Sequence, residues 1–423
     1  MLDQPETLNI DHIRAEVKTD IDLNRSKSIS NRVQIIKALC SEPFTIENLS
    51  DSDDSQLLHT LLNQDGLETY DAHHAGTTYR FLCSYLATRP GTQVLTGSSR
   101  MKERPIGPLV KALRSLGVDI KYLEKEGYPP LSIGSPPSTW KSEVTLPADI
   151  SSQYISSLMM IAPTLKNGLT IHLEGDLVSR PYLEMTIRIM EYFGAQVSWK
   201  DNSIKISHHP YQEKPFDVEA DWSAASYYYS ILALSPIGSS IRLNGLYQDS
   251  LQGDSKIAVM MESFGVKTEY EKDSIVISKQ EDHHPFFEYD FIEQPDLAQT
   301  IIVLCGALGI NGLFTGLKTL RIKETDRIHA LQEELKKYNV FLSKVPPRFA
   351  KKSQSEYYMV EGNASYSEDA VIETYRDHRM AMALAPLAIK FPIKMNKPGV
   401  VSKSYPFFWE HLKSCGFTYP KAT

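Results

Sequence analysis

The chain has 423 residues, which is enough for two domains that each bury a hydrophobic core. Its formal net charge of -7 argues against a nucleic-acid partner, and its apolar runs are too short to cross a membrane. Residues 1–20 are polar and acidic, unlike a signal or transit peptide, so we expect a cytoplasmic protein. The four cysteines and the three His-His pairs lack disulfide, zinc or other metal-ligand spacing, so we expect neither a disulfide framework nor a metal.

A degenerate unit recurs roughly every 70 to 80 residues and reads as a helix, a glycine, a strand, a tight turn and a second strand. The glycine is expected to end each helix as its C-cap, and Asn339 takes its place in the fourth copy. The helices that begin these copies are expected at residues 104–117, 180–194, 254–265, 324–339 and, in a shortened form, 406–416. Helices of a second type are expected between them at residues 28–39, 77–87, 153–162, 223–234, 296–308 and 378–389, with apolar strands such as 169–173 and 240–243.

This alternation of helices and strands predicts an α/β fold of six repeated units. The Pro-rich stretch 208–215 precedes a fresh unit, which favours a domain boundary shortly after it. We therefore expect an N-terminal three-unit domain at residues 25–218 and a C-terminal three-unit domain that combines residues 1–24 with residues 219–423.

Cationic and hydroxyl side chains stand at the expected start of nearly every helix. In chain order they lie in Lys27-Ser-Ile-Ser-Asn-Arg32, His74-Ala-Gly-Thr-Thr-Tyr-Arg80, Arg100-Met-Lys-Glu-Arg104, Ser151-Ser-Gln153, Ser179-Arg-Pro-Tyr182, Asp377-His-Arg-Met-Ala-Met382 and Ser402-Lys403, the last of which is expected to open the final helix. Any one of these motifs is more often a helix cap or a solvated charge. Together they predict groups that converge on one polyanion, because helix N-termini, arginine and lysine all favour anions.

The segment Arg321-Ile-Lys-Glu-Thr-Asp-Arg-Ile328 is the most charged of these helix starts. Thr325 or Asp326 is the expected N-cap, and Glu324 is a candidate for proton transfer beside an anion. A solvated, self-paired helix start is the alternative. The helix that follows is expected to bury Ile328, Leu331, Leu335 and Tyr338 and to turn Glu333, Glu334, Lys336 and Lys337 to water.

Taken in order, six of these motifs resemble the 5-enolpyruvylshikimate-3-phosphate synthase family of enolpyruvyl transferases. They are Ser-Lys-Ser-x-Ser-Asn-Arg, Ala-Gly-Thr-x-x-Arg, Arg-Met-x-x-Arg-Pro, Ser-Ser-Gln, Lys-Glu-Thr-Asp-Arg and Asp-His-Arg-Met-Ala-Met, and the acidic run 51–54 also fits. The resemblance implies two domains of three inverse α/β units of the βαβαββ type, which close on the substrates with the active site in the cleft between them. It implies transfer of the enolpyruvyl group of phosphoenolpyruvate to the 5-hydroxyl of shikimate 3-phosphate, with release of phosphate, in the pathway to chorismate and the aromatic amino acids. It implies no metal and no organic cofactor, and we expect a monomer.

The same resemblance assigns roles to individual residues. Proton transfer falls to Asp296 and Glu324, assisted by Lys27, although helix capping stays an alternative for Asp296 alone. The residues implied to hold phosphoenolpyruvate are Lys27, Gly76, Arg100, Gln153, Arg327, Arg379 and Lys403. The residues implied to hold shikimate 3-phosphate are Lys27, Ser28, Arg32, Ser151, Ser152, Gln153, Ser179, Tyr182, Asp296 and Lys323. His378 is expected to be a neighbour of the site without an assigned role.

The chain departs from the family pattern at a few positions. Leu23-Asn-Arg25 replaces Leu-Pro-Gly, His74 replaces an asparagine, and Thr319 stands where asparagine is common. Two alternatives compete with the synthase. A UDP-N-acetylglucosamine enolpyruvyl transferase would need a cysteine in the loop 97–101, which has none, and Cys83 is expected in the core. A non-catalytic anion-binding homologue would not need the full set of acids and bases.

Overall fold

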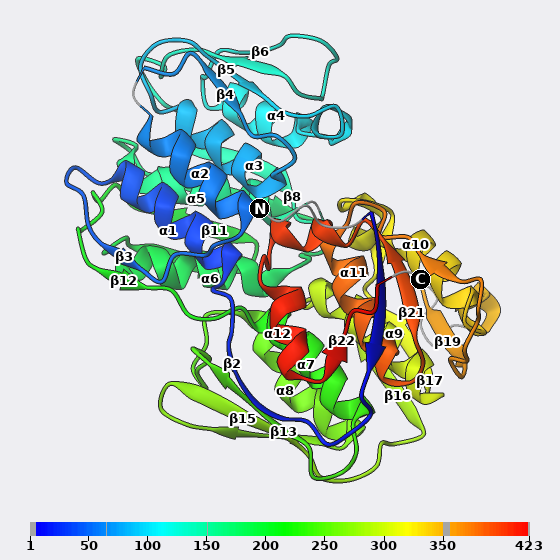
Figure 1. The fold of residues 1–423 in the computed structure, drawn as a ribbon. Coiled ribbons are helices and arrows are strands. Elements are labelled where there is room, and N and C mark those ends of the chain that lie inside the picture. The colour runs from blue at the N-terminus through cyan, green and yellow to red at the C-terminus, as the bar shows by residue number, and fades with distance from the viewer. Residues whose placement is uncertain (1–5, 65, 150, 350–355, 422–423) are drawn as a thin grey trace. The chain divides into compact units, whose positions relative to one another are not determined.

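The computed structural model describes residues 6–64, 66–149, 151–349 and 356–421 (Figure 1). Contacts between Cα atoms divide the chain into two compact units. We call Arg25–Val218 the N-terminal unit, and Met1–Asn24 together with Glu219–Thr423 the C-terminal unit. Within the described ranges, no helix is both long enough and apolar enough to reach across a bilayer.

The C-terminal unit contains three four-stranded mixed sheets. Its helices are α7 (Trp222–Leu234), α8 (Ile257–Met260), α9 (Ala298–Leu308), α10 (Arg327–Lys336), α11 (His378–Leu384) and α12 (Phe408–Ser414). Its strands are β1 (Thr7–His12), β2 (Lys18–Asp22), β13 (Ser240–Asn244), β14 (Val266–Tyr270), β15 (Ser274–Lys279), β16 (Phe286–Asp290), β17 (Asn311–Thr315), β18 (Val340–Lys344), β19 (Tyr358–Gly362), β20 (Val371–Ile372), β21 (Ile393–Asn396) and β22 (Phe417–Thr418). The unit β16-α9-β17-α10-β18-β19 shows the pattern in full, with β16 and β17 parallel and the remaining pairs of the sheet antiparallel.

The first strands of the chain complete the other two sheets of the C-terminal unit. β2 pairs in parallel with β13, in the position that β16 takes beside β17. β1 lies between β21 and β22 and is antiparallel to both. The N-terminal segment therefore belongs to the C-terminal unit because its backbone hydrogen bonds are made there.

The N-terminal unit has two four-stranded sheets and one much smaller pair of strands. Its helices are α1 (Lys27–Leu39), α2 (Asp53–Asn63), α3 (Gly76–Leu86), α4 (Gly107–Ser115), α5 (Ser152–Ile161) and α6 (Arg180–Tyr192). Its strands are β3 (Ile46–Glu47), β4 (Thr69–Asp71), β5 (Gln93–Thr96), β6 (Ile120–Tyr122), β7 (Leu131–Ile133), β8 (Glu143–Pro147), β9 (Leu169–Glu174), β10 (Val197–Lys200), β11 (Ser203–Ile206) and β12 (Phe216–Asp217). Figure 1 shows α1, α2, α3 and α5 packed side by side. In the first repeated unit the sheet is reduced to the parallel pair β3 and β12, so this copy is more degenerate than the sequence suggested.

The residue after each repeat helix has the predicted left-handed conformation. The φ angles are 108° at Gly117, 88° at Gly194, 73° at Gly265 and 91° at Gly416. Asn339, which replaces glycine in the fourth copy, has a φ of 62°. Asparagine is one of the few side chains that tolerate this conformation, so the repeat pattern is confirmed at the backbone level.

Three predicted helices are wrong in detail. The helix expected at 378–389 ends as α11 at Leu384 and continues as the 3₁₀ turn Ala385–Ile389. Residues 254–265 form short consecutive turns, Gly253–Lys256 and Met261–Phe264 of the 3₁₀ type around the single α-turn of α8. Ser402 and Lys403 end the 3₁₀ turn Pro398–Lys403 instead of opening a helix, and α12 begins later, after Pro406. Proline explains this last case, because Pro406 would lie in the interior of a helix that opened at Ser402.

Helix α10 confirms the predicted apolar stripe but corrects its polar face. Ile328, Leu331, Leu335 and Tyr338 are buried, and Asp326 is the N-cap, accepting hydrogen bonds from the amides of Ile328 and His329. Glu333 and Lys336 are exposed as expected. Glu334, predicted to face water, is 0% exposed, because side chain and backbone donors from residues 373–375 surround its carboxylate. Lys337, also predicted to face water, is partly buried against it.

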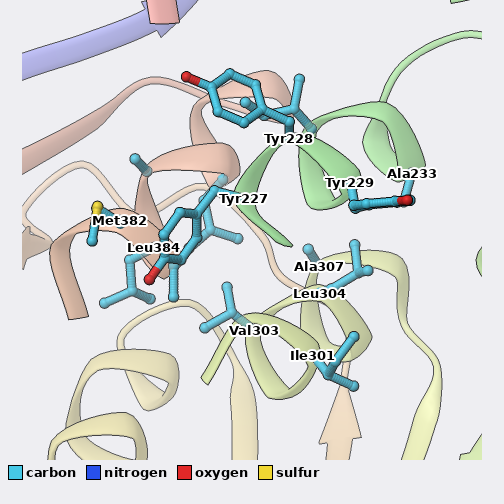
Figure 2. Packing of buried hydrophobic residues seen from close by; sticks show 14 of the residues in the cluster. Tyr227, Tyr228, Tyr229, Ala233, Ile301, Val303, Leu304, Ala307, Met382 and Leu384 are labelled. Atoms are coloured by element: carbon cyan, nitrogen blue, oxygen red, sulfur yellow. The ribbon is translucent and has the colours of Figure 1, made fainter. Parts of the chain in front are cut away.

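The core of the C-terminal unit lies between α7, α9 and α11. Figure 2 shows Tyr227 of α7 beside Met382 and Leu384 of α11, with Val303 of α9 next to them. Helices α7 and α9 are buried on nearly all sides, which is why their sequences are apolar throughout. This packing fixes the three helices against one another and so fixes the spacing of their N-terminal ends.

The left-handed glycines generate a test of the repeat. At Gly265 an added Cβ would collide with the backbone carbonyl of Glu281, whereas at Gly238, with a φ of 96°, it would lie 3.6 Å from the nearest atom, Oε1 of Glu16. We expect Gly238→Ala to cost about 1 kcal/mol of unfolding free energy from the backbone alone. We expect Gly265→Ala to cost about 3 kcal/mol or more, because a backbone clash is added. Urea unfolding of both variants checks this, and equal losses would contradict it.

Candidate active site

One buried guanidinium lies at the centre of the charged cluster in the C-terminal unit. Arg327 is the first residue of α10 and is only 1% exposed. Its Nε lies 2.7 Å from Oδ2 of Asp377, and its Nη2 lies 3.2 Å from Oδ1 of the same carboxylate. This is a two-point arginine–carboxylate pair, the geometry in which a buried charge is best compensated. Asp377 is itself fully buried as the N-cap of α11 and accepts from the amide of Arg379.

The two carboxylates proposed for proton transfer contact this same guanidinium. Nη2 of Arg327 donates to Oε2 of Glu324 at 2.9 Å, and Nη1 donates to Oδ1 of Asp296 at 3.3 Å. Glu324 lies in the bend before α10, and Asp296 lies in the 3₁₀ turn Pro295–Leu297 that leads into α9. Burial alone would lower the pKa of Arg327, but the carboxylates of Asp377, Glu324 and Asp296 together raise it above its ordinary value. The arginine is therefore a permanent cation shared by three acids.

Further cations contact the same two carboxylates. Asp296 accepts from Nη2 of Arg379 at 3.0 Å and lies 3.4 Å from Nζ of Lys323. Lys403 places its Nζ 3.3 Å from Oε1 of Glu324. Asp296 thus contacts three cations and Glu324 two. His378 is buried at the start of α11, next to these groups in the chain. In the described ranges, no three His, Cys, Asp or Glu side chains are grouped as a metal site would need.

A further buried acid, Asp254, lies near Arg379, and no feature of the sequence predicted it. Asp254 is 4% exposed, and its Oδ2 accepts a hydrogen bond from Oγ of Ser223 at the start of α7. Ser223 in turn lies 3.3 Å from Nη2 of Arg379. Burial raises the pKa of Asp254 to about 7, and the nearby charge of Asp296 adds to the effect. No charge pattern in the sequence marks Asp254, because its neighbours come from three other segments.

In the N-terminal unit, Lys27 is paired with an acid from the next helix. Nζ of Lys27 lies 3.2 Å from Oδ2 of Asp54, which is nearly fully buried in the first turn of α2. The backbone carbonyl of Asp54 accepts from the hydroxyl of Thr78 in α3. In the sequence, the acidic run 51–54 fits the family pattern but carries no predicted function. The structure shows that its last residue holds the lysine at the start of α1.

Gln153 and Gly76 lie close to one arginine of the same unit. Oε1 of Gln153 accepts from Nη1 of Arg80 at 3.0 Å, and its Nε2 donates to the hydroxyl of Thr77. A Cβ added at Gly76 would meet the guanidinium groups of Arg104 and Arg80. A side chain at this position would push the two guanidinium groups aside, so glycine leaves room for both arginines at the start of α3. Arg80 closes the motif 75–80 but received no role from the sequence.

Arg32 is directed into its own unit. It is 2% exposed, and burial lowers its pKa to about 10. Its guanidinium donates to the backbone carbonyls of Ser28 and Tyr182 and to the hydroxyls of Thr186 and Ser156. Within the described ranges no carboxylate pairs with it, so the charge is compensated by neutral oxygens and by the ring of Phe81, whose centroid lies 5.4 Å from Cζ.

The remaining sequence candidates differ in exposure. Arg100 is exposed, and its Nη1 lies 2.7 Å from Oε2 of Glu103. Ser151 caps α5 by accepting from the amide of Gln153, while Ser152 is buried in the first turn. Ser179 is buried as the N-cap of α6 with a left-handed φ of 57°. Tyr182 and Ser28 are partly buried.

The titration of Asp254 predicts a change of stability with pH. Its folded pKa of about 7 lies above the ordinary aspartate value of 3.8, so between these values the folded state binds the proton more strongly than the unfolded state. Stability from this group is therefore present at low pH and is lost as the pH rises toward 7. We expect Asp254→Asn to gain up to about 1.4 kcal/mol per pH unit relative to the wild type over that range, measured by urea unfolding. Asp273→Asn, at an exposed turn, is the matched control, and a pH-independent difference for Asp254→Asn would contradict the assignment.

Comparison with known proteins identifies the family of this fold and cluster. Residues 64–412 match the family model described as EPSP synthase (3-phosphoshikimate 1-carboxyvinyltransferase). The chain is 47% identical over 405 residues to the 3-phosphoshikimate 1-carboxyvinyltransferase of Bacteroides fragilis (strain YCH46), covering 95% of this chain and 96% of the relative. It is 35% identical over 429 residues to the protein of the same name from Sulfurovum sp. (strain NBC37-1), covering 94% and 96%.

A solved structure shows the same fold over the whole length. The EPSP synthase of Acinetobacter baumannii aligns with a TM-score of 0.77 at 18% identity and covers 99% of this chain and 100% of that one. The architecture is thus the two-domain enolpyruvyl transferase fold. The match to the family model and the identity to full-length relatives show that this chain belongs to the EPSP synthase (3-phosphoshikimate 1-carboxyvinyltransferase) family.

Proposed function

We propose that this chain transfers the enolpyruvyl group of phosphoenolpyruvate to the 5-hydroxyl of shikimate 3-phosphate and releases phosphate, a step on the route to chorismate and the aromatic amino acids. The observation that carries the proposal is the sharing of Arg327 by Asp296 and Glu324. Two carboxylates with a common buried cation and further cations around them suit a reaction that moves protons among anionic substrates. The family to which the chain belongs is named for this activity.

The chemistry is an addition followed by an elimination. The hydroxyl of the acceptor loses its proton as its oxygen attacks C2 of phosphoenolpyruvate, and C3 gains a proton. The tetrahedral adduct then loses a proton from C3 and expels phosphate, which restores the double bond. Asp296 serves the hydroxyl and Glu324 serves C3, with Lys27 assisting. Several cations lie beside both carboxylates and stabilise their charged forms.

The cations of the C-terminal unit supply the anion-binding side of the site. We propose that Arg327, Arg379 and Lys403 bind the phosphate and carboxylate of phosphoenolpyruvate, and that Lys323 binds shikimate 3-phosphate. Arginine and lysine next to carboxylates that are only partly exposed can exchange those partners for substrate oxygens. Arg327 keeps its two-point pair with Asp377 through Nε and Nη2, which leaves Nη1 and the second N–H of Nη2 for the ligand.

We propose that the N-terminal unit contributes the second set of ligands, so that the substrates bind in a cleft between the two units. Lys27, Gly76, Arg100 and Gln153 would contact phosphoenolpyruvate. The groups proposed for shikimate 3-phosphate are Lys27, Ser28, Arg32, Ser151, Ser152, Gln153, Ser179 and Tyr182. The proposed role of Gln153 in substrate binding is supported by its side-chain amide, which lies at the start of α5 and contacts Arg80 and Thr77. The buried hydrogen bond from Arg32 to the carbonyl of Ser28 favours a role for Arg32 in holding Ser28 at the start of α1. The monomeric state and the cytoplasmic location stay predictions from the sequence.

The structure speaks against the cysteine-dependent alternative. A UDP-N-acetylglucosamine enolpyruvyl transferase would need a reactive cysteine near Arg100. Cys83 is fully buried in α3, and burial raises the pKa of its thiol to about 12, so it is confirmed as a core residue.

Replacing the proposed proton-transfer acid tests the function directly. We expect the wild-type chain to release phosphate only when both substrates are present and not with UDP-N-acetylglucosamine as acceptor. We expect Glu324→Gln to lower kcat by about 10²–10⁴-fold, because a positioned general acid–base contributes on that scale. Both KM values should change by less than about threefold, since the amide keeps the size and polarity of the side chain.

The control is Glu293→Gln, an exposed carboxylate three residues before Asp296. It should leave kcat and both KM values unchanged. A Glu324→Gln enzyme with nearly wild-type kcat would remove Glu324 from the chemistry. A folded wild-type chain that binds both substrates without releasing phosphate would favour the non-catalytic homologue.

A further inference from the structure

A strained turn precedes the residues that hold and surround Arg327. Tyr375 and Arg376 have φ angles of 51° and 55°, two consecutive left-handed residues that are not glycine. Such residues are uncommon and persist only where surrounding contacts hold them. Asp377, the partner of Arg327, and Arg379, the partner of Asp296, follow directly. The placement of both side chains therefore depends on what fixes this turn.

The contacts that fix the turn converge on Glu334 of α10. Its Oε2 accepts from the amide of Glu373 at 3.0 Å, and its Oε1 accepts from the phenol of Tyr375 at 2.8 Å. Nζ of Lys337 lies 2.9 Å and 2.7 Å from the two oxygens and also donates to the carbonyl of Val371. The carboxylate is 0% exposed, yet every contact it makes is with a donor.

Glu334 and Arg327 are seven residues apart on the same helix, which places them on one face two turns from each other. Arg327 contacts Asp377, and Glu334 contacts residues 373 and 375. One rigid helix thus holds both sides of the strained pair Tyr375-Arg376. Burial raises the pKa of Tyr375, so its phenol stays protonated and able to donate.

We propose that Glu334 is a positioning residue of the enzyme, which fixes the turn 373–376 and thereby sets Asp377 and Arg379 for binding phosphoenolpyruvate. The inference rests on the proposed function and adds a residue outside the substrate contacts. A carboxylate is needed because it offers only acceptors, whereas a glutamine amide would turn an N–H₂ group toward at least one of the donors. The expected effect falls on phosphoenolpyruvate, since Arg327 and Arg379 are its proposed ligands.

Two variants test this positioning role in steady-state phosphate release. Glu334→Gln should raise the KM for phosphoenolpyruvate by about tenfold, because one buried bond is replaced by an unpaired donor. Tyr375→Phe deletes only the phenol bond and should raise the same KM by about three- to fivefold. The KM for shikimate 3-phosphate should stay within about twofold of the wild type in both. The matched control is Glu333→Gln, the exposed neighbour on α10, which should leave all parameters unchanged.

A purely structural role would give a different result. Both variants would then lose thermal stability while the folded fraction keeps the wild-type KM for phosphoenolpyruvate, and that outcome would overturn the inference. If Glu334→Gln does not fold, an unchanged KM in Tyr375→Phe overturns it equally. A wild-type chain without phosphate release would instead overturn the proposed function and this inference together, so the two failures are distinguishable.

Discussion

The C-terminal unit depends on one buried ion pair, Arg327 with Asp377. Taking both charges out of water is unfavourable, and the two-point geometry compensates for it only while both partners are present. Removal of Arg327 would leave the buried carboxylate of Asp377 without its cation, at a cost of about 3 to 5 kcal/mol. Because Arg327 begins α10 and Asp377 begins α11, the pair also fixes the two helix starts on which the other charged groups lie.

The rest of the cluster follows from this anchor. With its Nε committed to Asp377, Arg327 directs its remaining N–H groups to Asp296 and Glu324, which therefore share one cation. Arg379 contacts Asp296 and Lys403 contacts Glu324, which adds positive charge beside both acids. The carboxylates hold the cations in place without substrate, and the same cations can then neutralise substrate anions. The helices α7, α9 and α11 supply the rigid support, because their apolar surfaces pack together below the charged ends.

Much of the fold could be predicted from the sequence because its repeat has local signals. Glycine or asparagine after each repeat helix indicates a residue with left-handed backbone conformation, and the apolar stripe of α10 indicates which face of the helix is buried. The sequence failed where burial depends on distant segments. Glu334 looks solvated within α10 but is covered by residues 373–375, some forty residues later in the chain. The reduced β3–β12 sheet and the broken helix at α8 have no clear local signal either.

The candidate site shows the same limit. Charged motifs at helix starts marked Glu324, Arg327 and Arg379 as candidates. Asp296 and the grouping of all four came from a family resemblance, since spacing along the chain carries no distances. Asp54 and Arg80 lie inside motifs that were noted without a role, and their contacts with Lys27 and Gln153 became visible only in three dimensions. Asp254 had no signal at all, because its importance lies in a bond to Ser223 from another segment.

We propose that one phosphoenolpyruvate molecule contacts the cluster around Arg327 and Lys27 at the same time. A crystal structure of Glu324→Gln with phosphoenolpyruvate and shikimate 3-phosphate tests it most directly. We expect Arg327 to remain paired with Asp377 while its Nη groups and Nζ of Lys27 contact the same phosphoenolpyruvate. A ligand bound to only one unit, or an Arg327 that leaves Asp377 to reach it, would contradict the claim.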